Sequence, residues 1–98
     1  MEGHASISND VLARYAGDAA REVSGVHALV DGSLPGRRAA VRVAEEGGRV
    51  RLELHVSVDW GASIPDVGRA VQGRVREYLD RMADVDLVAV DVVVDEVS

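Results

Sequence analysis

Residues 50 to 58 constrain the fold most, because apolar and polar side chains alternate there without interruption. Five aliphatic residues occupy the even positions from Val50 to Val58, and every odd position between them is polar. A period of two is typical of a strand with one buried side and one solvent-facing side. We therefore predict a strand over residues 49–58 whose leucines and valines face the core.

A Gly-Gly pair joins this strand to residues 39–45, which we predict to be a second strand. Two glycines suit a two-residue hairpin turn, because both turn positions accept a positive φ. With that turn, Val41 faces Leu54 across the ladder. Arg42 then faces Glu53, so apolar pairs and opposite charges both match. A shift of one residue would turn the valines to solvent, and the pattern therefore predicts an antiparallel hairpin in this register.

The first of two predicted helices lies before the hairpin. Ser8, Asn9 or Asp10 can cap its first turn, and Gly25 ends it with a left-handed residue. Its apolar face is rich in alanine, which predicts close packing against a flat partner such as a sheet. The short apolar segment 26–30 that follows is either a strand or an extended lead-in.

The second helix follows the hairpin and carries an apolar stripe from Ile64 to Met82. Residues 59–63 form the bend before it, and Pro65 suits its first turn. Gly68 and Gly73 lie inside this helix and are expected to allow close approach to the sheet or to the first helix.

The chain ends in a strand of mostly β-branched residues from Leu87 onward. We expect one face of this strand to carry Val88, Val90, Val92 and Val94. The other face would carry Leu87, Ala89, Asp91, Val93, Asp95 and Val97. The order helix, hairpin, helix, strand predicts a two-layer α+β fold, with both helices on one face of a three- to four-stranded mixed sheet.

Composition excludes several classes of protein. Ninety-eight residues make one small domain, here residues 7–98 after a tail of residues 1–6. The chain has no Cys and no Lys, which excludes disulfides, thiolate zinc sites, a Walker-type phosphate loop and a Schiff-base lysine. A net charge of -6 with scattered arginines disfavours nucleic acid as a partner. No apolar run is long enough to span a bilayer and no signal region begins the chain, so we expect a cytoplasmic protein without direct membrane insertion.

Candidate catalytic and metal-binding residues are scattered. His4, His27 and His55 lack the spacing of a metal-ligand pair and are interpreted as surface residues. The aspartates near the last strand (Asp84, Asp86, Asp91 and Asp95) could hold a hard cation, but a solvated acidic edge explains them better. A triad of Ser57, His55 and Asp59 can be assembled only from strand neighbours. We therefore predict no enzyme activity, no metal and no cofactor.

The ordered series of these features resembles the alkaline shock protein family of bacterial cell-envelope stress proteins. The resemblance spans about residues 7 to 97 and is strongest around the Trp60-Gly61 pair. The residues that carry it are Ile7, Ser8, Asp10, Val11, Gly25, Val26, Val56, Val58, Trp60, Gly61, Ile64, Val71, Gln72, Val75, Met82, Val90, Val92, Val94 and Val97.

The resemblance implies a non-enzymatic scaffold or adaptor domain that self-assembles. It also implies a partner, either a second copy or a membrane-anchored protein with a related domain, that holds the chain at the cytoplasmic face of the membrane. The alternative is a K-homology-like module that binds RNA or a ligand. Such a module needs a Gly-x-x-Gly clamp with basic neighbours, which the chain does not supply.

Four residues are the predicted partner-binding set: Trp60, Leu87, Val93 and Val97. The last three would lie on the sheet face that two helices leave open, and exposed apolar strips often mark interaction sites. Trp60 has two interpretations, as a cap on the open end of the core or as an exposed anchor for a partner.

Overall fold

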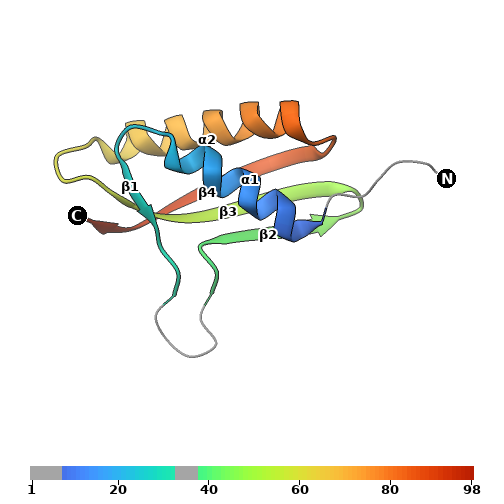
Figure 1. Ribbon diagram of the computed structural model, residues 1–98, viewed down its shortest axis with the longest axis horizontal. Coiled ribbons are helices and arrows are strands. Elements are labelled where there is room, and N and C mark those ends of the chain that lie inside the picture. Colours follow the sequence, from blue (N-terminus) through green and yellow to red (C-terminus); the bar gives the residue numbers. More distant parts are fainter. Residues whose placement is uncertain (1–7, 33–37) are drawn as a thin grey trace.

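The computed structural model describes residues 8–32 and 38–98. The elements follow the order shown in Figure 1: α1 (Asn9–Arg21), β1 (Val26–Leu29), β2 (Val41–Glu46), β3 (Arg49–Val58), α2 (Ile64–Met82) and β4 (Asp86–Val97). The tail of residues 1–6, which includes His4, and Ile7 of the family resemblance lie outside the described residues.

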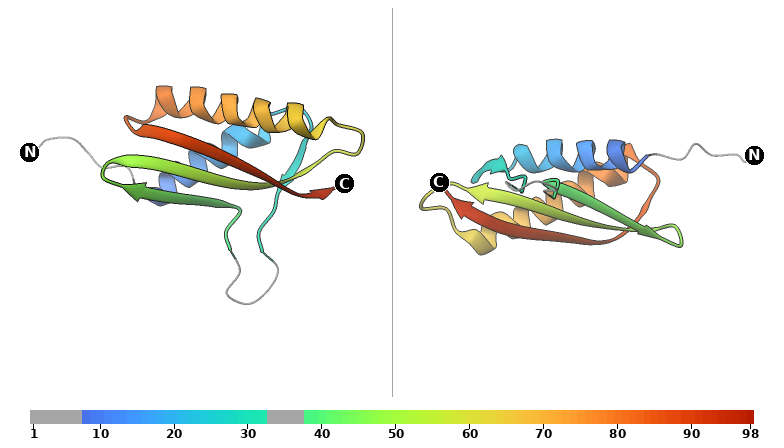
Figure 2. Two further views of the ribbon diagram at one scale, coloured as in Figure 1. Left: turned by 180° about the vertical axis from the view of Figure 1, so that it is seen from behind. Right: turned by 90° about the horizontal axis from the view of Figure 1, so that it is seen from below.

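The two helices lie side by side on one face of the sheet, which confirms the predicted two-layer α+β fold (Figure 2). The alanines of α1 allow the close packing predicted for them, since Ala16, Ala19 and Ala20 are fully buried. Edge-to-face packing of Tyr15 on Tyr78, with ring centroids 5.9 Å apart, joins the two helices. The core lies between the layers and includes Leu12, Val67, Val71, Val75, Leu79, Val50, Leu52, Leu54, Val56 and Val58.

The sheet is mixed and has four strands, with β3 at its centre. One edge of β3 pairs with β4 in parallel along its whole length. The other edge is shared, because β2 pairs antiparallel with residues 49–54 and β1 pairs antiparallel with residues 56–58. The segment from Val26 is therefore a strand, the first of the two alternatives left open by the sequence.

The hairpin has the predicted register. Arg42 is the partner of Glu53 and Val41 is the partner of Leu54. Gly47 and Gly48 adopt φ values of 60° and 79°, as a two-residue turn of this kind requires. The alternation of apolar and polar residues and the two turn glycines therefore determine the register of the hairpin together.

Both helices begin at serine caps. The side-chain oxygen of Ser8 accepts from the backbone N–H of Val11, and that of Ser63 accepts from the backbone N–H of Asp66. The first helix ends at Arg21, four residues before Gly25, so the predicted end was wrong. Gly25 has a φ of 98° and lies in the turn that leads into β1.

The expectation for the two glycines inside α2 was also wrong. A Cβ added at Gly68 or Gly73 would meet no atom within 4 Å. Neither glycine therefore serves close approach to the sheet or to α1.

Two irregularities in β4 correct the predicted faces of this strand. The register shifts between the pairs Val50–Leu87 and Arg51–Ala89, which turns Leu87 toward the helices. Leu87 is buried in the core, so it cannot belong to an open partner-binding surface. A second shift near Asp95 pairs Val97 with Val58 and places Val97 on the helix side of the sheet. An extra residue in one strand reverses the alternation that follows it, and the sequence pattern does not reveal where this occurs.

Candidate functional site

The sheet face opposite the helices, called here the open face, is dominated by charged residues. Paired residues of neighbouring strands point to the same side of a sheet, so the partners of the odd β3 positions lie on this face. Its members include Arg42, Ala44, Arg49, Arg51, Glu53, His55, Ser57, Ala89, Asp91 and Val93, together with Asp95, which contacts His55.

Ion pairs connect the strands across the open face. Arg51 and Asp91 link β3 to β4 with an N–O distance of 4.0 Å, and Arg42 and Glu53 link β2 to β3 at the same distance. Each of these side chains is more than a third exposed, so a single pair stabilises the sheet by less than about 1 kcal/mol. The pairs nevertheless compensate charge along the face.

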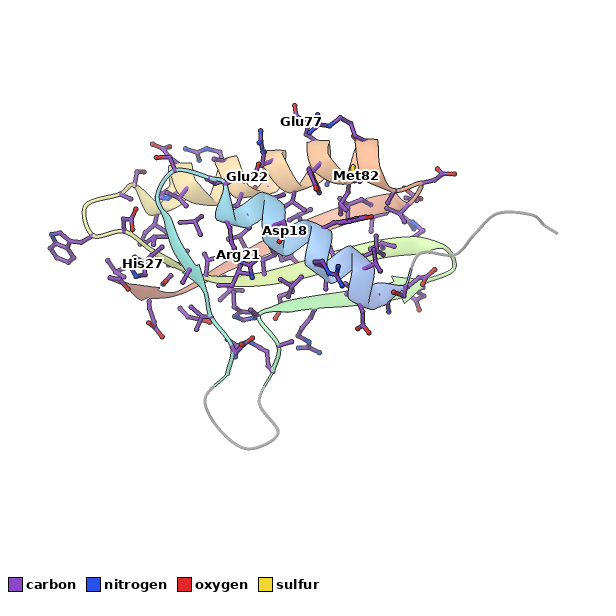
Figure 3. The ribbon with its side chains drawn as sticks, in the orientation of Figure 1. Asp18, Arg21, Glu22, His27, Glu77 and Met82 are labelled. Atoms are coloured by element: carbon purple, nitrogen blue, oxygen red, sulfur yellow. The ribbon has the colours of Figure 1, made fainter. Side chains whose placement is uncertain are left out.

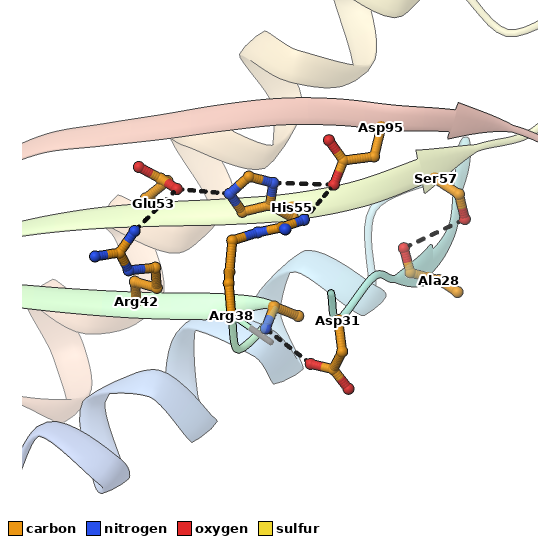
Figure 4. Close-up of polar contacts among 9 residues, drawn as sticks. Ala28, Asp31, Arg38, Arg42, Glu53, His55, Ser57 and Asp95 are labelled. Atoms are coloured by element: carbon orange, nitrogen blue, oxygen red, sulfur yellow. Dashed lines mark hydrogen bonds and ion pairs between the residues drawn. The ribbon is translucent and has the colours of Figure 1, made fainter. Parts of the chain in front are cut away.

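His55 is the most unusual residue on this face, because its side chain is only 9% exposed. Its Nε2 lies 2.6 Å from Glu53 Oε2, and its Nδ1 lies 2.9 Å from Asp95 Oδ2 (Figure 4). Arg38 donates to the same Asp95 oxygen at 2.6 Å. We call these four residues the His55 cluster. The interpretation of His55 as an ordinary surface histidine was wrong.

The His55 cluster lowers the pKa of the Glu53 carboxyl below its ordinary value near 4.5. The hydrogen bond from His55 is the largest cause, and the positive charges of Arg42 and Arg38 add to it. The ionised carboxylate is therefore the form that the folded chain favours at this position.

The three residues considered as a catalytic triad, Ser57, His55 and Asp59, contact different partners. Ser57 donates to the backbone oxygen of Ala28 at 3.5 Å, and Asp59 Oδ1 lies 3.3 Å from His27 Nδ1. His55 contacts Glu53 and Asp95 instead. The arrangement does not place a nucleophile next to a base.

Three of the four aspartates considered as cation ligands lie near arginine side chains. Asp86 lies 3.9 Å from Arg49, Asp91 lies 4.0 Å from Arg51, and Asp95 contacts Arg38. Within residues 8–32 and 38–98, no group of three or more histidine or acidic side chains is arranged to hold a metal ion.

Large apolar side chains are exposed at the end of the sheet where β3 leads into α2. Trp60 is 85% exposed, so its interpretation as a cap on the core was wrong. The backbone N–H of Trp60 donates to Ser98 O, and the adjacent Val97 is 47% exposed. We call Trp60 and Val97 the apolar tip. The loop between β3 and α2 and the C-terminus lie at the same end of the sheet (Figure 1). Val93, 37% exposed, lies on the open face four residues earlier.

Helix α2 covers part of the outer edge of β4. Gln72 Nε2 donates to Val90 O at 3.0 Å, and Arg76 Nη1 donates to Leu87 O at 2.9 Å. Both contacts fall in the first half of β4. In the described part of the chain, no helix is long and apolar enough to cross a membrane.

Sequence reasoning missed the His55 cluster and the exposure of Trp60 for different reasons. The cluster joins residues up to 57 positions apart, as in the Arg38–Asp95 contact, and no local pattern signals it. The scarcity of aromatic residues, with one Trp in the chain, did single out Trp60, but its exposure depends on the direction of the bend after β3.

Comparison with known proteins identifies a family and a fold. The model of the alkaline shock protein 23 family, described as having a cell envelope-related function, matches residues 1–98. The comparison with curated proteins gives no match.

The chain is similar in fold to solved structures of the MamM CTD. One variant aligns with a TM-score of 0.68 at 17% identity, over 89% of this chain and 95% of that chain. The nickel form of another variant aligns with a TM-score of 0.67 at 16% identity, over 89% of this chain and 96% of that chain. At these identities the likeness concerns the fold.

Proposed function

Because the chain belongs to the alkaline shock protein 23 family, we propose that it is a non-enzymatic scaffold or adaptor domain of the cell envelope. It self-assembles and docks on a membrane-anchored protein with a related domain, at the cytoplasmic face of the membrane. The envelope-related description of the family supports the location. The separation of Ser57, His55 and Asp59 supports a role without catalysis.

The exposure of Trp60 carries this proposal. A tryptophan buries more apolar area than any other side chain, and leaving 85% of it in water has a cost that binding a partner would remove. Tryptophan is enriched among residues that dominate the energy of protein interfaces. Val97, 47% exposed and next to the residue that accepts from the Trp60 backbone, adds a second exposed apolar side chain at this end of the sheet.

The second half of β4 leads to the apolar tip and offers a further site of contact. The hydrogen bonds that Gln72 and Arg76 of α2 donate to backbone carbonyls of β4 both fall in the first half of the strand. Val93 presents a further apolar side chain on the open face. Trp60, Val93 and Val97 are the proposed partner-binding residues, with Val93 on the open face and Val97 on the helix side of the sheet. A strand from a neighbour that pairs with the outer edge of β4 would reach both faces.

The charge pattern favours a protein partner over RNA. Arg42 and Arg51 on the open face each face a carboxylate, so these arginines are already neutralised. Phosphate binding needs a concentrated surface of free cations. The K-homology-like alternative therefore has less support than the scaffold.

Sedimentation velocity over a range of concentrations tests the proposal on the full chain. We expect a concentration-dependent shift to larger species, and we expect Val93→Asp and Trp60→Asp each to weaken association at least tenfold. A buried aspartate without a partner is costly at an interface. Pull-down of membrane proteins from the native organism with both variants tests docking.

Met82→Asp is the matched control, because Met82 is 45% exposed at the far end of α2 from the apolar tip (Figure 3). We expect this variant to associate and to retain partners like the wild type. A wild-type chain that stays monomeric, together with unchanged partner binding by Val93→Asp, would contradict the proposal.

A further inference from the structure

The His55 cluster contains more hydrogen-bond acceptors than a neutral imidazole can satisfy. A neutral histidine has one N–H donor, whereas a protonated histidine has two. In the cluster both ring nitrogens face carboxylate oxygens, at 2.6 Å for Glu53 and 2.9 Å for Asp95. The observed geometry therefore corresponds to the doubly protonated ring.

The charged groups near this ring come from β2, β3, β4 and the segment before β2. Glu53 lies on β3 beside the ring, and Asp95 approaches from β4. Arg38, from the segment before β2, holds Asp95, and Arg42 of β2 lies 4.0 Å from Glu53. Loss of the ring proton would leave a nitrogen lone pair facing a carboxylate, and one of the two contacts would open.

The backbone of His55 forms hydrogen bonds with the two segments that contain Val30 and Ala40. Its N–H donates to Ala40 O at 2.8 Å, and its carbonyl accepts from the N–H of Val30 at 2.9 Å. Asp31 in turn accepts from the N–H of Ala40 at 2.8 Å. The position of His55 thus affects β3, β4 and the two segments 30–32 and 38–40.

From this geometry we propose that the His55 cluster is a pH-sensitive brace. With the ring doubly protonated, it fastens the end of β4 and the segments 30–32 and 38–40 to the centre of the sheet. When the ring loses a proton at higher pH, one carboxylate contact is released and these segments loosen. Histidine is the side chain most often found in such pH-dependent contacts.

Amide hydrogen exchange at pH 6 and pH 8.5, corrected for the intrinsic exchange rate at each pH, tests the brace on the full chain. We expect protection of the Val30 amide and of residues 93–97 to fall about tenfold at the higher pH, the effect of losing one charge-assisted hydrogen bond. His55→Gln should remove this pH dependence, because glutamine does not titrate.

His27→Gln is the matched control, since His27 is 55% exposed and contacts the single carboxylate of Asp59. It should keep the wild-type pH dependence. Asp95→Asn provides a second test if His55→Gln fails to fold, and it should shrink the dependence at residues 93–97. Equal protection of the wild type at both pH values would overturn the proposal. So would a dependence that survives in both His55→Gln and Asp95→Asn, or one that disappears in His27→Gln.

Discussion

At the scale of single residues, the glycines of α2 are the simplest positions to test. Gly68 and Gly73 lie in the helix interior, and a Cβ at either would meet no atom within 4 Å. Alanine restricts the unfolded chain more than glycine, so each substitution to alanine should stabilise the fold by about 1 kcal/mol. Urea unfolding measures this change.

Gly25→Ala serves as the opposite control in the same experiment. Gly25 has a φ of 98°, and a Cβ there would lie 2.6 Å from a methyl group of Val67. We expect a clear loss of stability. Stabilisation by this variant, or loss of stability in Gly68→Ala, would show that the helix packing is described incorrectly.

Glu53 should make the stability of the chain sensitive to acid. Its pKa is lowered by the hydrogen bond from His55. A carboxyl with a lowered pKa in the folded state adds stability above its unfolded pKa near 4.5, and this stability disappears as pH falls through the folded value. Urea unfolding between pH 6 and pH 2 should therefore show that the free energy of unfolding falls less toward low pH in Glu53→Gln than in the wild type. Glu45→Gln is the control, because Glu45 is an exposed residue of β2. If Glu53→Gln lost as much stability toward low pH as the wild type, the coupling to His55 would be refuted.

The sequence predicted the side of the sheet on which His55 lies, but not its burial. Alternation along β3 is a local property and places the residue on the open face. Its burial depends on Asp95 and Arg38, which lie on other segments and 40 and 17 positions away. A pattern that extends over neighbouring residues carries no information about such contacts.

At the scale of elements, the hairpin and β4 show what a sequence pattern can determine. The hairpin register follows from a turn and two flanking alternations, and every partner predicted for it was found. In β4, two register shifts reverse the alternation, so Leu87 and Val97 point to the side opposite to the one predicted. Runs of valine fit either face equally well, and the sequence therefore gives no warning of a bulge.

The Arg42–Glu53 contact tests the hairpin directly. The two side chains lie 4.0 Å apart and are 63% and 37% exposed. A double-mutant cycle with Arg42→Ala and Glu53→Ala should give a coupling energy between roughly 0.2 and 1 kcal/mol that shrinks at high salt. A coupling energy of zero at low salt would argue against the register.

At the scale of the whole molecule, the two-layer arrangement was predictable because each helix has one apolar face and the sheet has one apolar face. These faces have to be buried together, and a single sheet side accommodates both helices (Figure 2). Which apolar side chains remain outside this core depends on the final packing. The exposure of Trp60 is therefore a property of the folded molecule.

The molecule is also expected to fold without a metal ion. The acidic side chains of β4 named above face arginines or His55, so they have partners without a cation. Thermal melts with and without a strong chelator should coincide within about one degree. A downward shift of several degrees on chelation would reveal a metal that contributes to stability.

The exposed Trp60 is the only tryptophan in the chain, and its fluorescence gives the most direct test of the scaffold proposal. Acrylamide quenching of this residue should be strong in dilute solution, where the indole is in water. It should weaken, with a blue shift of the emission, as the chain is concentrated or mixed with its membrane-anchored partner, because the indole becomes buried. Val93→Asp should prevent both changes, and Met82→Asp should not. Quenching and emission that stay constant from dilute to concentrated protein and in the presence of native membranes would contradict the proposal.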